Sequence, residues 1–249
     1  MTKVLINGIT GRMGQVLLKE LENYPSFEVI GGIGRKDLSG IRVFKNTSEI
    51  NEKVDAIIDF STPESCMKIL PYAKENNIKV VIATTGFTKE EESIIEKYSK
   101  DIAIFKSSNM SYEINLMCDI VSSLAKKLNG ADIEIVETHH RNKIDSPSGT
   151  ALMLAGSINN ALNNEMEYTY DRHLVKEKRK DKEIGIHSIR GGNEVGAHSV
   201  LFFSENESFE ITHNVSSRSV FASGAINACE YILNKENGLY DMKDLIKGW

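Results

Sequence analysis

The sequence predicts an α/β fold, with a parallel-sheet domain at the N-terminus and a second, α+β domain built on a mixed sheet. Between residues 3 and 106, short apolar runs alternate with longer amphipathic runs, which is typical of repeated strand–helix units. After Asn109 this alternation stops, and a long amphipathic run precedes segments that alternate polar and apolar residues. We therefore expect a first domain over 1–110, completed by 219–249, and a second domain over 111–218.

Each expected strand of the first domain is a short apolar run bounded by glycine, proline or polar turn residues. Between these strands lie longer runs whose apolar residues recur at helical spacing. The expected strands are 4–7, 28–33, 56–60, 80–84 and 102–105, and the expected helices are 15–22, 64–76 and 89–100.

The second domain should begin with an amphipathic helix, and its strands should form a mixed or antiparallel sheet of the kind that often supports association. The expected helix is 113–127, and the expected strands are 133–138, 183–190, 198–204 and 208–213. A final helix over 219–233 should pack back on the first domain, which is therefore discontinuous in sequence.

Composition excludes several classes of function. The 249-residue chain has a net charge of −5, and its one basic run, 176–182, is expected to be a solvated face, so we expect no nucleic-acid partner. No apolar stretch approaches the roughly 20 residues that span a bilayer, and residues 1–3 lead into a strand rather than a signal peptide. We therefore expect a soluble, cytoplasmic protein. The three cysteines are far apart, which is typical of reduced, structural thiols.

A strand, a glycine turn and a helix at the N-terminus predict a Rossmann-like dinucleotide-binding domain. Gly8, Gly11 and Gly14 would permit a tight turn, close approach of backbone amides to a pyrophosphate, and close packing of the helix. The spacing departs from the commoner Gly-x-Gly-x-x-Gly, and the alternative is a glycine-rich turn without a ligand. The turn residues expected to bind the cofactor are Gly8, Ile9, Thr10, Gly11, Arg12 and Met13.

The end of the second expected strand bears on the choice of cofactor. A site specific for NAD usually has Asp or Glu there to accept hydrogen bonds from the ribose hydroxyls. This chain has Gly34, Arg35 and Lys36 instead, and Asp37 lies slightly too far beyond the end of the strand for that role. Because arginine and lysine can pair with a 2′-phosphate, they favour NADPH or at least tolerate it. A solvated turn is the alternative interpretation of these two cations.

Two further strand ends should open onto the same crevice, because ligands of such sheets bind beyond the carboxyl ends of the strands. Small and polar side chains there leave room for a nicotinamide ribose. The expected contacts are Ala83, Thr84 and Thr85 after one strand, and Ser107, Ser108, Asn109 and Met110 after the other.

The segment 137–151, ETHHRNKIDSPSGTA, combines the residues most suited to catalysis. A Pro-Ser pair forms a stop-and-cap signal, so Gly149 and Thr150 should open a helix whose free amides can receive a carboxylate or phosphate. Lys143 adds a positive charge, and His139 and His140 can exchange protons near neutral pH. An anionic substrate is implied.

Other roles are open for these residues. Adjacent residues of a strand face opposite ways, so one of the two histidines could point elsewhere unless the strand has ended. The pair could bind a metal or be purely structural, although no cysteine or carboxylate falls at a familiar ligand spacing, and we expect no metal. Lys143 could be a solvated charge.

With these residues in view, nearly the whole chain resembles the 4-hydroxy-tetrahydrodipicolinate reductase family of the diaminopimelate and lysine pathway. The motifs that carry the resemblance are GITGRMG at 8–14, DFSTP at 59–63, ATTGF at 83–87, the segment 137–151, and IHSIRGG at 186–192.

The resemblance implies a small cyclic imine dicarboxylate as the substrate. Hydride would pass from NADPH or NADH to ring carbon C4, with loss of water from the hydroxylated precursor, and a proton would be delivered at C3. By the same resemblance, His139 is a proton donor or acceptor, Lys143 the proton donor and His140 a substrate ligand. Gly149 and Thr150 would form the amide cradle for a carboxylate. A nearby cationic acid would stabilise the negative charge that builds on the enamine.

The resemblance also implies a homotetramer whose second domains join their sheets. Relatives specialised for NADH often carry Glu at the position of Gly34, which is glycine here, so we expect activity with both cofactors and some preference for NADPH.

Two other classes of function share part of this pattern. A related amino-acid or semialdehyde dehydrogenase would share the glycine turn but need not share the cluster of histidines, lysine and helix start. A nucleotide sensor without catalytic activity would bind NADPH and would have no need of Lys143. A reductase that has lost its assembly is a third alternative, which a mass measurement would expose.

Overall fold

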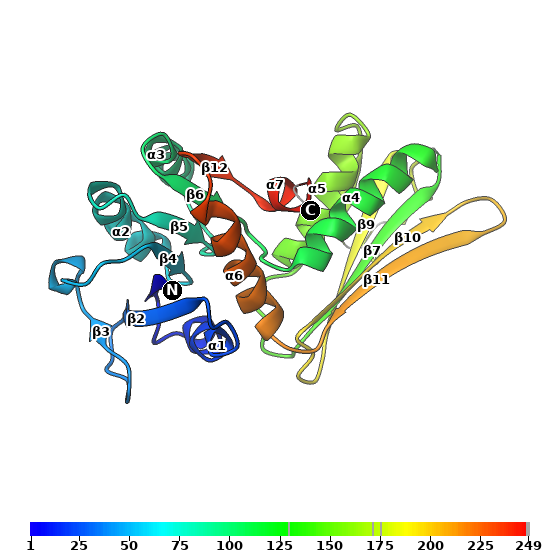
Figure 1. Ribbon diagram of the computed structural model, residues 1–249. Coiled ribbons are helices and arrows are strands. Elements are labelled where there is room, and N and C mark those ends of the chain that lie inside the picture. The colour runs from blue at the N-terminus through cyan, green and yellow to red at the C-terminus, as the bar shows by residue number, and fades with distance from the viewer. Residues whose placement is uncertain (129, 171, 175, 248–249) are drawn as a thin grey trace. The chain divides into compact units, whose positions relative to one another are not determined.

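The computed structural model describes residues 1–128, 130–170, 172–174 and 176–247. The chain divides into two compact units. Figure 1 colours the chain by residue number from blue to red, so the residues of each unit can be followed in it. Unit 1 comprises residues 1–112 and 218–249, and unit 2 comprises residues 113–217.

Unit 1 is built on a seven-stranded sheet whose neighbouring strands pair in parallel. Its order is β12-β6-β5-β4-β1-β2-β3. The strands are β1 (Thr2–Asn7), β2 (Phe27–Ile33), β3 (Val43–Phe44), β4 (Ala56–Asp59), β5 (Lys79–Ile82), β6 (Ala103–Lys106) and β12 (Gly238–Tyr240). The chain runs outward from β1 to β3 and then returns to β4 beside β1, so the turn after β1 lies at the switch point where such sheets bind ligands.

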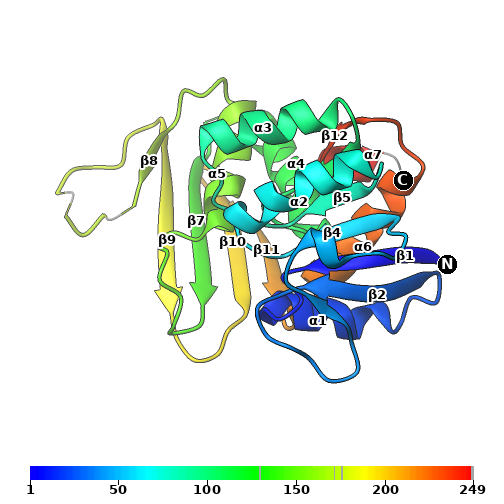
Figure 2. The ribbon, with the colours of Figure 1, turned by 90° about the vertical axis from the view of Figure 1, so that its left-hand side faces the viewer.

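Helices cover both faces of this sheet (Figures 1 and 2). Apolar residues of α1 (Arg12–Leu21), α6 (Ser219–Leu233) and α7 (Met242–Lys247) pack in one core, and those of α2 (Pro63–Glu75) and α3 (Lys89–Ser99) pack in the other. A short 3₁₀ turn, η1 (Thr47–Glu49), follows β3.

Local signals start two of these helices. Thr62 caps α2 with Pro63 in its first turn, and Thr88 and Glu91 form a capping box at α3.

Unit 2 is a five-stranded mixed sheet, in the order β11-β10-β7-β9-β8. The strands are β7 (Asp132–His139), β8 (Glu167–Thr169), β9 (Glu183–Arg190), β10 (Gly196–Phe203) and β11 (Ser208–Val215). Strand β7 pairs in parallel with β9 and antiparallel with β10. One face packs against α4 (Tyr112–Lys127) and α5 (Gly149–Ala161), where alternate strand residues such as Ile133 and Ile135 are buried.

The expected α/β class and the mixed second sheet are confirmed, and every expected helix and strand is present with ends shifted by a few residues. Helix α1 starts at Arg12 rather than at residue 15, because Gly11 is already its N-cap. The short strands β3, β8 and β12 were not expected, because a run of two or three residues is too short to show the alternation of polar and apolar residues that marks a strand. The three cysteines are buried, one in each core cluster.

The basic run 176–182 is a solvated face, as expected, except at Arg179. The Arg179 side chain is only 18% exposed. Its guanidinium pairs with Asp132 and Glu134 of β7 and donates to the carbonyls of Ile133 and Glu183. Arg179 therefore ties the loop before β9 to the sheet.

Candidate functional site

The glycine turn after β1 has the close packing that its sequence predicted. Gly8 has a φ of +85°, and a Cβ there would lie 2.5 Å from the Phe60 carbonyl oxygen. A Cβ on Gly14 would lie 2.2 Å from the Gly8 carbonyl oxygen. The backbone just after β4 and the backbone of the glycine turn itself therefore leave no room for side chains at these positions. The start of α1 directs its free amides to the carboxyl end of the sheet.

A cavity of about 680 Å³ opens beside this turn. That volume is typical of a site that takes a cofactor-sized ligand. The expected cofactor residues that line the cavity are Gly8, Thr10, Gly11 and Arg35. The lining residues that were not expected as ligands are Ile33, Gly34, Lys45, Asn46, Thr47, Phe60, Ser61, Thr62, Glu64, Ser65, Lys68 and Ile69.

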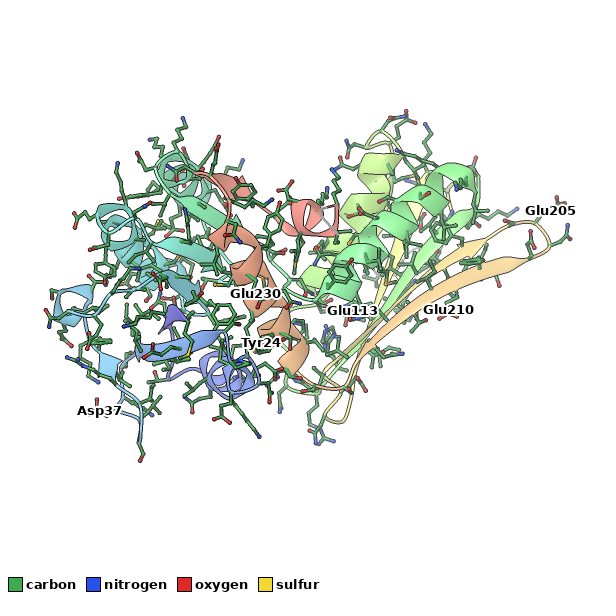
Figure 3. The ribbon with its side chains drawn as sticks, in the orientation of Figure 1. Tyr24, Asp37, Glu113, Glu205, Glu210 and Glu230 are labelled. Atoms are coloured by element: carbon green, nitrogen blue, oxygen red, sulfur yellow. The ribbon has the colours of Figure 1, made fainter. Side chains whose placement is uncertain are left out.

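The part of the cavity near the end of β2 carries positive charge. Arg35 lines it, and Lys45 enters it from the residue after β3. The Lys45 ammonium lies 2.8 Å from the carboxylate of Asp37, which Figure 3 labels on the loop after β2. A Cβ on Gly34 would lie 2.6 Å from the Thr10 methyl group, so an acidic side chain at position 34 would have to displace Thr10.

A buried hydrogen-bond network lies under the cavity. Asn7 donates to Asp59 at 2.8 Å and to Ser61 at 2.9 Å, and Ser65 donates to Asn7 at 3.0 Å. The Ser61 amide donates to the Thr84 hydroxyl at 2.9 Å, so Thr84, an expected cofactor residue, positions the end of β4. Burial raises the pKa of Asp59, although hydrogen bonds from Ser61 and other neighbours oppose that change. The network joins the carboxyl ends of β1, β4 and β5 to the start of α2.

The other expected cofactor residues do not line the cavity. The side chains of Ile9 and Met110 are in the core, 0% and 2% exposed, so only their backbone atoms can reach a ligand. Arg12, Thr85 and Ser108 are exposed, and Met13, Ala83, Ser107 and Asn109 are half-buried. For all of these residues, contact with a cofactor stays a prediction.

In unit 2, a cluster of titratable groups surrounds the end of β7. His139 is the last residue of β7, and Glu137 lies on the same face two residues before it. The Glu137 carboxylate lies 2.5 Å from His139 Nδ1 and accepts two hydrogen bonds from Arg190, at 2.7 and 2.8 Å. Burial acts to raise the pKa of Glu137, but hydrogen bonds from Arg190, Ser188 and His139 outweigh it and lower that pKa to about 2.

A second histidine packs against the first. The rings of His139 and His198 meet edge to face, with centroids 5.1 Å apart. The hydroxyl of Ser148, the N-cap of α5, lies 3.0 Å from His198 Nε2 and accepts from the Ala151 amide at 3.1 Å. Burial lowers the pKa of His198 to about 4, so this ring is neutral at neutral pH. Burial also lowers the pKa of His139, against the opposing effect of Glu137.

The remaining expected catalytic residues lie in the same segment. Lys143 is close enough for its charge to lower the pKa of His139, and its ammonium lies 2.8 Å from Asp145. His140 follows the last residue of β7, and its amide donates to the Glu194 carbonyl at 2.8 Å. The strand has therefore ended between the two histidines.

Gly149 and Thr150 form the first turn of α5, as expected. A Cβ on Gly149 would meet nothing within 4 Å, so there is open space beside this residue. The first amides of a helix have no acceptor within it and can bind a carboxylate. The segment thus brings together the start of α5, a lysine and a histidine.

The sequence reasoning missed Glu137, Arg190 and His198 as parts of this cluster. A signal for Glu137 was present, because residues two apart in a strand share a face. Arg190 and His198 are brought in by strand pairing, since His139 is opposite Arg190 and Glu137 is opposite His198.

Among the residues that the structure describes, no group of three or more histidine, cysteine or carboxylate side chains is placed to hold a metal ion. The helices of this described part include none that is both long and apolar enough to span a bilayer.

Comparisons with known proteins agree on one family. Residues 2–110 match the family described as "Dihydrodipicolinate reductase, N-terminus", and residues 113–246 match "Dihydrodipicolinate reductase, C-terminus". The 4-hydroxy-tetrahydrodipicolinate reductase of Caldanaerobacter subterraneus subsp. tengcongensis is 44% identical, over 99% of both chains. That of Clostridium novyi is 41% identical, over 99% of both. A solved structure of dipicolinate-bound dihydrodipicolinate reductase from Paenisporosarcina sp. TG-14 has a TM-score of 0.81 at 25% identity, over 97% of both chains.

Proposed function

This chain belongs to the dihydrodipicolinate reductase family, and we propose that unit 1 holds its nicotinamide cofactor while unit 2 binds its substrate and moves protons. The enzyme reduces 4-hydroxy-tetrahydrodipicolinate, by way of dihydrodipicolinate, to tetrahydrodipicolinate on the diaminopimelate route to lysine. NADH or NADPH is its reductant. The observation that carries the assignment of residues is the cluster of His139, Lys143 and the start of α5 in one short segment.

The cavity of unit 1 fits a dinucleotide. The turn at Gly8 and Gly11 brings the start of α1 to the carboxyl end of β1, where a pyrophosphate would be held, and side chains at Gly8 or Gly14 would clash with backbone. Arg35 and Lys45 would hold the 2′-phosphate of NADPH. When bound, the reduced nicotinamide supplies the hydride.

The residues of unit 2 suit a small dicarboxylate. In this proposal the first amides of α5, at Gly149 and Thr150, bind one carboxylate, and His140 and Lys143 contribute further contacts. Addition of hydride at C4 of the ring builds negative charge on an enamine. Lys143, as a cationic acid, stabilises that charge and delivers a proton to C3, and His139 exchanges protons as donor or acceptor.

Cofactor choice follows from the charges near the end of β2. We propose that both cofactors are used and that NADPH is preferred, because Arg35 and Lys45 can pair with a 2′-phosphate. Asp37 pairs with Lys45, which leaves its carboxylate less suited to receive ribose hydroxyls. Values of kcat/KM for the two cofactors test this, and a large excess for NADH would contradict the charge argument.

The assay of function is oxidation of NADPH or NADH, with the substrate generated in place by its synthase from pyruvate and aspartate semialdehyde. Lys143→Ala should lower kcat by about 100-fold or more, because proton transfer by a positioned acid contributes about that much. Binding of NADPH to unit 1 should be unchanged. A folded protein that binds NADPH but oxidises neither cofactor would favour a nucleotide sensor.

We also propose a cytoplasmic homotetramer. Ile189 and Phe203, on the face of the unit 2 sheet away from α4 and α5, are 51% and 41% exposed, and such apolar residues favour association. Three buried cysteines suit a reducing compartment. The mass in solution, with and without NADPH, tests the assembly, and a monomer at assay concentration would contradict it.

A further inference from the structure

Glu137 is a fully buried carboxylate with several donors around it. Its Oε2 lies 2.5 Å from His139 Nδ1 and 2.8 Å from Arg190 Nη1. Its Oε1 accepts from Arg190 Nη2 at 2.7 Å and from the Ser148 amide at 3.2 Å. Both oxygens are therefore satisfied, as a buried charge requires.

This arrangement fixes which ring nitrogen of His139 carries hydrogen. An ionised carboxylate only accepts hydrogen bonds, so Nδ1 must be the donor. In the neutral ring, Nε2 then carries the lone pair and is the atom that can take up a proton. A Cβ on Gly196 would lie 3.0 Å from Nε2, so the glycine at that position leaves this atom uncrowded.

Arg190 prevents the carboxylate from holding His139 permanently charged. Its two hydrogen bonds to Glu137 neutralise the carboxylate, and it also donates to the Asp145 carbonyl at 2.7 Å. Burial then lowers the pKa of His139, so the resting ring is neutral and can exchange a proton. A carboxylate without this arginine would stabilise the imidazolium more strongly.

The same carboxylate also holds the start of α5. The Ser148 amide that donates to Glu137 belongs to the N-cap residue that precedes Gly149 and Thr150. One side chain thus sets the position of the histidine relative to the amides that would bind a carboxylate.

We propose that Glu137, clamped by Arg190, is a positioning residue that fixes His139 with Nδ1 protonated and Nε2 as its proton-exchanging atom. It does so while keeping the start of α5 in place. This inference rests on the proposed role of His139.

The first test uses the wild-type enzyme. Nitrogen chemical shifts of its six histidines, with the His139 signal assigned from a His139→Gln variant, report which ring nitrogen carries hydrogen. We expect the Nδ1–H form at pH 7.5. An Nε2–H form would overturn the proposal, and this result does not depend on whether any Glu137 variant folds.

The second test is Glu137→Gln, which keeps the size of the side chain and removes its charge. We expect kcat to fall about 100-fold, because misplacement of a catalytic group costs roughly that much. The pKa of His139 in the pH profile of kcat should move down, since a stabilising negative charge is lost. The Kd for NADPH should be unchanged, because the cavity of unit 1 is intact.

The chain offers a matched control on the same strand. Glu134 of β7 pairs with His187 at 2.8 Å and with Arg179 at 3.1 Å, which repeats the Glu–His–Arg arrangement on the other face of the sheet. Glu134→Gln should leave kcat and its pH profile within about twofold of wild type. An equal loss in both variants would mean a general effect of removing a charge from β7.

A double variant separates this inference from the proposed function. If Glu137 acts through His139, Glu137→Gln should cost little further activity in a His139→Gln background. Loss of activity in His139→Gln with none in Glu137→Gln would overturn the positioning role alone. No loss in His139→Gln would instead refute the assignment of His139.

Discussion

Ser148→Ala should destabilise the protein more than loss of a helix cap explains. The Ser148 hydroxyl accepts from the Ala151 amide at 3.1 Å and lies 3.0 Å from His198 Nε2. Both Ser148 and His198 are buried, so water cannot replace the hydroxyl for either partner. The substitution removes a cap and also leaves a buried ring nitrogen without its partner.

The expected cost has two parts. An N-cap serine contributes about 1 kcal/mol. A buried polar atom without a hydrogen bond costs about 1–3 kcal/mol. The free energy of unfolding should therefore fall by about 2–4 kcal/mol. For a chain of this size each kcal/mol lowers Tm by about 2–4 °C, so the midpoint should fall by roughly 4–16 °C.

Thr88→Ala is the matched control for the cap. Thr88 caps the exposed start of α3 and accepts from the Glu91 amide at 3.2 Å, without a buried histidine beside it. Its removal should cost about 1 kcal/mol. Thermal and urea unfolding of the two variants give the comparison.

A double-mutant cycle that combines Ser148→Ala with His198→Leu isolates the hydrogen bond between Ser148 and His198. In that background Ser148→Ala should cost only about 1 kcal/mol, because no ring nitrogen is left unpaired. If Ser148→Ala is no more destabilising than Thr88→Ala in the wild-type background, the reasoning about His198 is refuted.

Three further predictions concern the cofactor, the glycine turn and pH. Arg35→Ala should raise KM for NADPH by about tenfold, because a hydrogen bond to a charged group contributes about 1.5–3 kcal/mol. KM for NADH should stay within about twofold of the wild-type value. Equal changes in KM for the two cofactors would contradict the assignment of Arg35 to the 2′-phosphate. Gly14→Ala places a Cβ 2.2 Å from the Gly8 carbonyl oxygen, so it should cost about 1–3 kcal/mol in urea unfolding and weaken NADPH in a fluorescence titration. The pKa of His198 is about 4 when folded, against about 6.5 when unfolded, so between these pH values only the unfolded chain takes up the proton. Stability should therefore be full above pH 6.5 and fall by about 3 kcal/mol by pH 4, and unfolding curves of His198→Leu should show much less of this decrease.

Local patterns explain what the sequence could predict. The strands and helices of unit 1 follow from runs of apolar residues and the turn residues between them, and the glycine turn follows from Gly8 and Gly14. The segment 137–151 holds both the strand end and the helix start, so its residues are near one another whatever the rest of the fold does.

Contacts between distant residues explain what the sequence could not predict. Arg190 reaches Glu137 only through the register of β7 and β9, which are 53 residues apart along the chain at this contact. Lys45 enters the cavity after β3, which is too short to show a period. The burial of the Met110 side chain depends on α6, which packs so closely on the Met110 backbone that a Cβ on Gly224 would lie 1.7 Å from its carbonyl oxygen.

The path of the chain through unit 1 affects how a newly made molecule can fold. Helix α6 and strand β12 complete the sheet that residues 1–112 begin, yet residues 113–217 are synthesised between the two parts. At roughly 5–20 residues per second, translation of that insert delays the arrival of α6 by on the order of 5–20 s. During this interval the apolar surface of β4, β5 and β6 that α6 later covers has no partner from its own chain, whereas unit 2 is continuous in sequence and can fold as it emerges. We therefore expect unit 1 to expose apolar surface for longer than unit 2 while the chain is being made.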